Sequence, residues 1–191
     1  MPGKNPSEAF YNFHRPLQQN ITCLSRDDVL VASPGGRHEL GKTHGLSLAG
    51  GPMLLTGEGL QLDVGLQYEL IKTGETGKNA YRVTTRAYAY TLLDEDNKPL
   101  YGWHWHPFGK SSFFAPHTHP FGMGAHSILP HRAHMPSGRV SLESVVRCCI
   151  DQLGADAARD DWDKLLTLNE GKFELHRSWS DATGAPRPSD A

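Results

Sequence analysis

One stretch in the middle of the chain constrains the fold most strongly. Between positions 60 and 70, apolar side chains stand at every even position, with polar residues or glycine between them: Leu60, Leu62, Val64, Leu66, Tyr68 and Leu70. Successive side chains of a strand point to opposite faces, whereas an α-helix would spread these positions around its axis. The pattern therefore predicts a β-strand with one face buried, and hence a sheet whose apolar face is covered by other elements of the fold.

Two further segments extend this strand into an antiparallel sheet. The sequence TGETGKN is typical of a turn, and residues 81–93, rich in Tyr, Thr and Val, predict a second strand. The sequence DEDNKP predicts another turn, and residues 100–106 a third strand. Short turns between successive strands indicate a β-meander.

The register across the second turn decides which side chains share a face. If Leu93 lies opposite Leu100, the aromatic residues pair across the two strands, and on the reverse face two small alanines lie beside two histidines. The expected pairs are Tyr90 with Trp103, Tyr88 with Trp105, Ala89 with His104 and Ala87 with His106.

The helix signal comes later in the chain. Apolar residues at positions 142, 145, 146, 149, 150 and 153 form one stripe, and Gly154 ends it. Residues 159–169 predict a shorter helix, and Glu143, Arg147 and Asp151 are expected on the solvated face of the main one. The predicted fold class is α+β: an antiparallel β-meander packed against one main helix in the C-terminal half and a shorter one.

Length and composition bound the domain organisation. The chain has 191 residues, 38% of them hydrophobic, which favours a single core. We expect one domain over residues 1–180, with a loop-rich N-terminal part at 1–59, and a disordered tail at 181–191. No apolar run is long enough to span a bilayer, and no secretory signal is evident, so the expected location is the cytoplasm, without a membrane partner.

A phosphate-loop pattern occurs near the N-terminus. The sequence GRHELGKT at positions 36–43 matches G-x-x-x-x-G-K-[ST], which requires a helix to open at the Lys-Thr pair. The following HGLSLAGGPM contains three glycines and a proline and should not be helical. We therefore interpret the match as a plain glycine-rich loop.

Histidine is the unusual residue of this sequence. Seven of the 11 histidines fall between positions 104 and 134, and four of them form two His-x-His pairs: His104 with His106 and His117 with His119. Side chains two apart in a strand or an extended segment project together, so each pair shares a face. Converging imidazoles favour a divalent metal, zinc first, with manganese or iron as alternatives.

The next segment carries groups suited to acid–base chemistry and anion binding. His126, His131 and His134 are candidate proton carriers, and Arg132 and Arg139 are candidate ligands for an anionic substrate. A cupin-type site would need a glutamate shortly after the second pair, and none is present. The net charge of −2 gives no general affinity for nucleic acid, although a local basic patch is compatible with it.

The order YRVTTRAYAYTLLDEDNKPLYGWHWHP, then PHTHP, then a helix after HMPSGRVSLESVV resembles the TumE-like toxins of bacterial toxin–antitoxin pairs over about residues 80–153. The resemblance implies a growth-inhibiting protein with a nucleic-acid target and an antitoxin partner.

Three hypotheses follow. The first is a metal-dependent hydrolase, such as a phosphodiesterase or nuclease, acting on nucleic acid or a small phosphorylated molecule. The second is metal-independent acid–base cleavage of RNA by the same histidines. The third is a non-catalytic metal-binding or interaction module.

Overall fold

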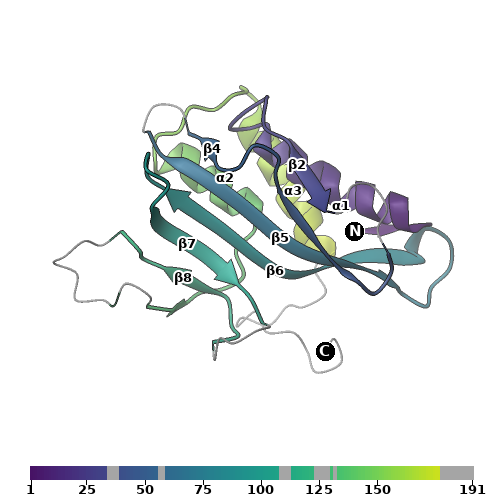
Figure 1. The fold of residues 1–191 in the computed structure, drawn as a ribbon. Coiled ribbons are helices and arrows are strands. Elements are labelled where there is room, and N and C mark those ends of the chain that lie inside the picture. The colour runs from purple at the N-terminus through teal and green to yellow at the C-terminus, as the bar shows by residue number, and fades with distance from the viewer. Residues whose placement is uncertain (34–38, 56–58, 108–112, 123–129, 131–132, 177–191) are drawn as a thin grey trace.

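A computed structural model describes residues 1–33, 39–55, 59–107, 113–122, 130 and 133–176. Over these residues the chain forms an antiparallel sheet with three helices grouped on one of its faces (Figure 1). Two of the helices lie in the C-terminal half, so the α+β fold class is confirmed. The expected tail at 181–191 lies outside the described residues.

The predicted meander is the centre of the sheet. It consists of β5 (Gln61–Lys72), β6 (Tyr81–Leu93) and β7 (Pro99–Trp105), and the 3₁₀ turn η1 (Gly77–Asn79) lies between the first two. Strand β5 alternates buried and more exposed positions over most of its length, as the apolar alternation predicts. Asn97, in the turn before β7, has a positive φ of 62°, a conformation that asparagine tolerates.

The cross-strand register of β6 and β7 is largely as predicted. Tyr88 pairs with Trp105, Ala89 with His104 and Tyr90 with Trp103. A shift between Leu92 and Leu93 places Leu93 opposite Pro99 rather than Leu100, and the described pairing ends before His106. The shift is confined to the turn end, so it leaves the face assignment of the histidines intact.

Shorter strands extend the sheet on both sides of the meander. The order is β2-β3-β5-β6-β7-β8-β9, where β2 is Leu30–Ser33, β3 is Thr43–Leu48, β8 is His117–His119 and β9 is Met135–Pro136. Strands β1 (Pro2–Gly3) and β4 (Met53–Leu54) pair beside β6 and β5. Because β3 begins at Thr43, no helix opens at the Lys-Thr pair of the phosphate-loop pattern, which confirms that interpretation for the described residues.

The N-terminal part is not loop-rich, and this prediction was wrong. Residues 6–21 form the 16-residue helix α1 (Pro6–Ile21). The Asn5 side chain caps it by accepting a 2.8 Å hydrogen bond from the Glu8 amide, and apolar residues of the helix pack on the core. Pro16 inside the helix obscures this in the sequence, because proline normally interrupts a helix.

The two C-terminal helices also differ from expectation. Helix α2 (Leu142–Asp151) has 10 residues, whereas α3 (Trp162–His176) has 15 and continues through Gly171, so the helix expected to be shorter is the longer one. Glu143 was expected in solvent, yet it is 2% exposed, because Asn20 of α1 donates a 2.8 Å hydrogen bond to its carboxylate. That partner comes from 123 positions away and cannot be read from α2 alone.

The helix-facing side of the sheet holds the core. Tyr88, Tyr90 and Trp105 lie there with side chains of the helices, and the Tyr88 hydroxyl accepts a 3.0 Å hydrogen bond from the Val140 amide just before α2. Because side chains alternate along a strand, His104 lies on the opposite face, away from the helices.

Candidate metal centre

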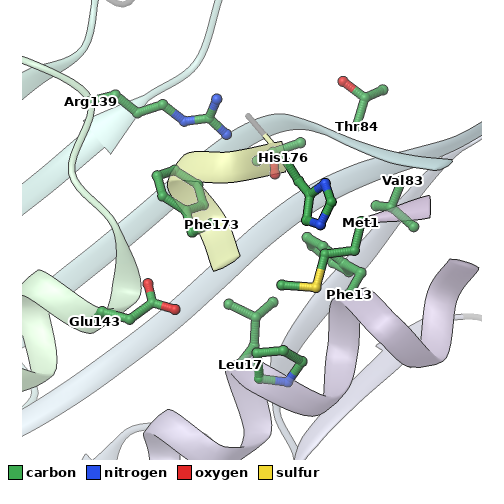
Figure 2. Close-up of a pocket in the computed structure, with 11 residues that line it drawn as sticks. Met1, Phe13, Leu17, Val83, Thr84, Arg139, Glu143, Phe173 and His176 are labelled. Carbon is green, nitrogen blue, oxygen red and sulfur yellow. The ribbon is translucent and has the colours of Figure 1, made fainter. Parts of the chain in front are cut away.

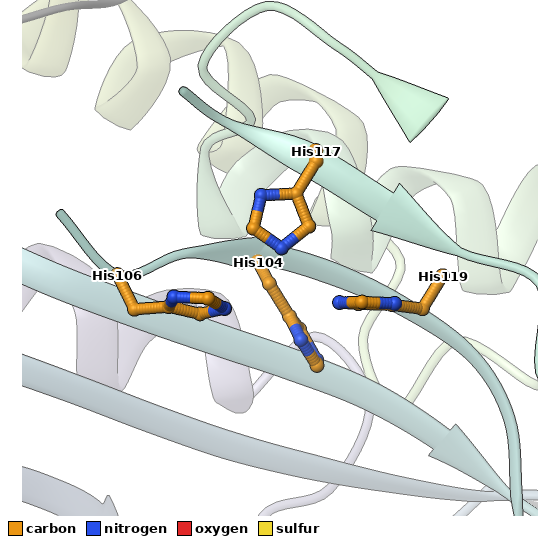
Figure 3. A group of neighbouring side chains, drawn as sticks. All are labelled: His104, His106, His117 and His119. Atoms are coloured by element: carbon orange, nitrogen blue, oxygen red, sulfur yellow. The ribbon is translucent and has the colours of Figure 1, made fainter. Parts of the chain in front are cut away.

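The four histidines of the two His-x-His pairs come together on this second face. Strand β8 pairs with β7 so that His117 lies opposite His104 and His119 lies opposite Gly102. His106 follows directly after β7. Figure 3 shows the four rings directed toward one another from these neighbouring segments. The prediction that the pairs converge is confirmed.

The separations suit a metal ion. Each histidine offers one ring nitrogen such that the four nitrogens all lie within 4.8 Å of one another, and no other such group of His, Cys, Asp or Glu occurs among the described residues. Zinc–nitrogen bonds of about 2.0–2.1 Å would place tetrahedral ligand atoms about 3.4 Å apart, so the most distant nitrogens need to approach each other by about 1.4 Å. Small side-chain rotations shared between the two rings suffice for a change of this size.

In His117 and His119, one ring nitrogen is held by a backbone hydrogen bond and the other has no hydrogen-bond partner. The Nδ1 atom of His117 lies 2.7 Å from the Ala115 carbonyl oxygen and donates to it, which leaves the lone pair on Nε2. His119 has a hydrogen bond with the backbone of Ala133. Its Nδ1 and the Nε2 of His117 are buried without a hydrogen-bond partner. Buried polar atoms normally have one, so these two nitrogens are the best indication of an ion.

His104 is positioned by two residues that the sequence interpretation missed. Its Nε2 lies 3.2 Å from the Thr91 hydroxyl oxygen, and if Nε2–H donates there, Nδ1 carries the lone pair. The ring lies over Gly102, where an added Cβ atom would come within 2.6 Å of Nε2. An isolated glycine inside a strand pattern often marks such a close approach, and that signal was available in the sequence.

Three of the four imidazoles are electrically neutral at physiological pH. Burial, followed by the neighbouring histidines, lowers the pKa of His104 to about 4 and that of His119 to about 4. Burial also lowers the pKa of His117. A metal must displace protons from histidine before it binds, so these three ligands carry no proton that competes near pH 7.

Aromatic rings and a fifth histidine border the cluster. Phe121 stacks on His119 with ring centres 4.9 Å apart, and Phe113 meets His117 edge-on at 5.1 Å. His134 lies at the exposed rim, its ring centre 4.7 Å from that of His117 and 4.5 Å from that of His119. Apolar rings therefore flank the centre, and an exposed imidazole lies beside it.

The described structure does not bring Arg139, one of the two predicted anion ligands, into the cluster. Arg139 lies on the helix side of the sheet, with its guanidinium carbon 5.4 Å from the Trp105 ring centre and 5.2 Å from that of Phe173. It is therefore separated by the sheet from the centre at which we expected it to hold a substrate. His126, His131 and Arg132 lie outside the described residues.

No protein-family model, curated protein or solved structure matches the chain. Among the described residues, no helix is long and apolar enough to cross a membrane. Function therefore has to be argued from the site itself.

Proposed function

We propose that this protein is a metal-dependent hydrolase, with zinc the expected ion and His104, His106, His117 and His119 its ligands. The observation that carries the proposal is the pair of buried ring nitrogens, Nε2 of His117 and Nδ1 of His119, that lie in the cluster without a partner. Neutral imidazoles suit zinc, with manganese and iron as weaker alternatives because, in the part of the chain that the structure describes, the group contains no carboxylate.

The ligand set favours chemistry at an electrophilic ion. A divalent cation held by four imidazoles would keep its full charge, and in a five-coordinate state that admits water it would lower the pKa of that water and attract an anionic oxygen. His134, exposed at the rim and close to His117 and His119, is placed to accept the proton. We infer a phosphodiester or a small phosphorylated molecule as the substrate, and a toxin-type nuclease with an antitoxin partner is the biological form that the resemblance implies.

The metal-free ribonuclease hypothesis is the weaker one. A general acid must carry a proton at the working pH, whereas His104 and His119 have pKa values of about 4 and are neutral near pH 7. A non-catalytic module remains the second candidate, because a shell of four protein ligands is typical of structural zinc sites.

Elemental analysis of untagged protein tests the metal directly. We expect about one zinc per chain in the wild type and far less in His117→Ala, because that variant loses the fully buried ligand. His176→Ala is the matched control, since His176 is exposed at the end of α3 and outside the cluster. A metal-free wild type would contradict the proposal.

Hydrolysis assays then separate enzyme from module. With bis(p-nitrophenyl) phosphate and single-stranded RNA as probes, we expect cleavage that a chelator abolishes and that zinc restores. His134→Ala should keep its metal and lose most activity, since a positioned proton carrier typically contributes about 10²–10⁴-fold in rate. Bound zinc without any cleavage would favour the structural module, and cleavage unaffected by chelator would favour metal-free catalysis.

A further inference from the structure

A second candidate site lies on the helix side of the sheet. A cavity of about 60 Å³ lies between α1, α3 and β6 (Figure 2), and a more open one of about 620 Å³ lies among α1, η1 and α3. Met1, Pro16 and His176 line both. The two cavities therefore adjoin, an inner pit beside a wider mouth.

Much of the lining of the inner cavity is apolar. Its walls include Phe13 and Leu17 from α1, Val83 from β6 and Phe173 from α3. At about 10–15 Å³ of this cavity space for each water-sized group, it accommodates roughly four to six such groups. Arg139 and Glu143 line the same cavity and limit the apolar stretch. The fitting occupant is therefore a short chain rather than a bulky ring.

The lining of the outer cavity, unlike that of the inner one, is rich in positively charged side chains. Arg15, Lys78 and Lys172 line the outer cavity, and Glu8 is its one lining carboxylate among the described residues. Glu8 already accepts a hydrogen bond from the Lys4 backbone amide at 3.2 Å. Three cations against one occupied carboxylate give a local positive charge in a chain whose net charge is −2. Such a mouth attracts anions.

We propose that the two cavities form one binding site for a small amphipathic anion, a short alkyl or acyl chain that ends in a carboxylate or phosphate. The chain fits the pit between Leu17 and Phe173, and the head group meets Arg15 and Lys78 at the mouth. Burial of the alkyl end and charge pairing of the head act at opposite ends of the same molecule. The site is independent of the histidine centre, from which the sheet separates it.

Calorimetric titration with four probes tests this assignment. Hexanoate and hexyl phosphate carry both features and distinguish the two head groups, acetate lacks the chain, and hexyltrimethylammonium reverses the charge. We expect hexanoate, hexyl phosphate or both to bind at least 10-fold more tightly than acetate and the ammonium compound. Equal binding of acetate and both hexyl anions would overturn the proposal.

Variants locate the binding. Arg15→Glu combined with Lys78→Glu should weaken it by at least 10-fold, whereas Lys98→Glu, at an exposed lysine that lines neither cavity, should leave it unchanged. Leu17→Trp should fill the pit; if it unfolds the protein, the surface charge variants still decide. Unchanged affinity in the double variant would refute the site, and loss of binding in His117→Ala would assign it to the histidine centre instead.

Discussion

Replacing Gly102 by alanine should weaken metal binding without touching any ligand. Gly102 lies in β7 opposite His119, and the His104 ring lies over it. The added Cβ would come 2.6 Å from His104 Nε2 and 3.2 Å from Cδ2 and Cε1. On a strand paired on both sides, the backbone fixes the position of the new Cβ atom at residue 102. The His104 imidazole therefore has to move.

The required movement follows from these distances. Ordinary contact of a Cβ atom begins near 3.4 Å, so Nε2 must shift by about 0.8 Å from its present 2.6 Å. A shift of that size also disturbs the 3.2 Å hydrogen bond between Nε2 and the Thr91 hydroxyl, which holds the ring. Loss of such a supporting contact typically costs about 10–100-fold in metal affinity, or about 1.4–2.8 kcal/mol.

The measurement is zinc affinity by competition with a chelator of known affinity. Gly65→Ala is the matched control: Gly65 also lies inside a strand, pairs with Ala89 in the same row as His104, and an added Cβ would lie 3.6 Å from the Ala89 oxygen, an ordinary contact. Gly65→Ala should bind zinc like the wild type. Equal affinity in both glycine variants would refute the argument that Gly102 makes room for the ligand.

Two further predictions concern stability. The metal-free protein should unfold at a lower urea concentration at pH 5 than at pH 7.5. His104 and His119 have pKa values of about 4 in the folded protein, against about 6.5 in the unfolded chain. The stability that their neutral rings contribute is therefore fully present above pH 6.5 and is lost as the pH falls toward 4. A flat profile over this range would contradict the burial of neutral rings. Glu143→Leu should cost about 1–3 kcal/mol in the free energy of unfolding, since it leaves the Asn20 amide buried without its acceptor. Chemical denaturation measures the loss, and Glu174→Leu, at an exposed position of α3, should change little.

Local regularities in the sequence were enough to predict the meander. The alternation from 60 to 70 fixes the faces of β5, and the short turns force β6 and β7 to lie beside it. The same reasoning gave the pairing of Ala89 with His104. Such features depend on spacing along one or two neighbouring strands, and strand geometry makes that spacing a reliable guide to the side of the sheet.

Other features could not be predicted from the sequence, because the residues that stabilise them are distant along the chain. Helix α1 contains Pro16, and a proline inside a helix removes a backbone hydrogen bond. The packing of α1 against the sheet and the other helices compensates for that loss. Glu143 is buried because Asn20 meets it, and Arg139 lies against Trp105 and Phe173 rather than near the histidines. No local period encodes these contacts.

The sequence by itself determined that each His-x-His pair projects as a unit, because residues two apart on a strand share a face. Only the tertiary structure decided that the pairs meet: β8 joins β7 in the register that sets His117 opposite His104, and Thr91 and Gly102 orient the ring between them. Register between separate segments is fixed by the packing and hydrogen bonding of the whole sheet, and a metal shell requires atoms placed to within a fraction of an ångström.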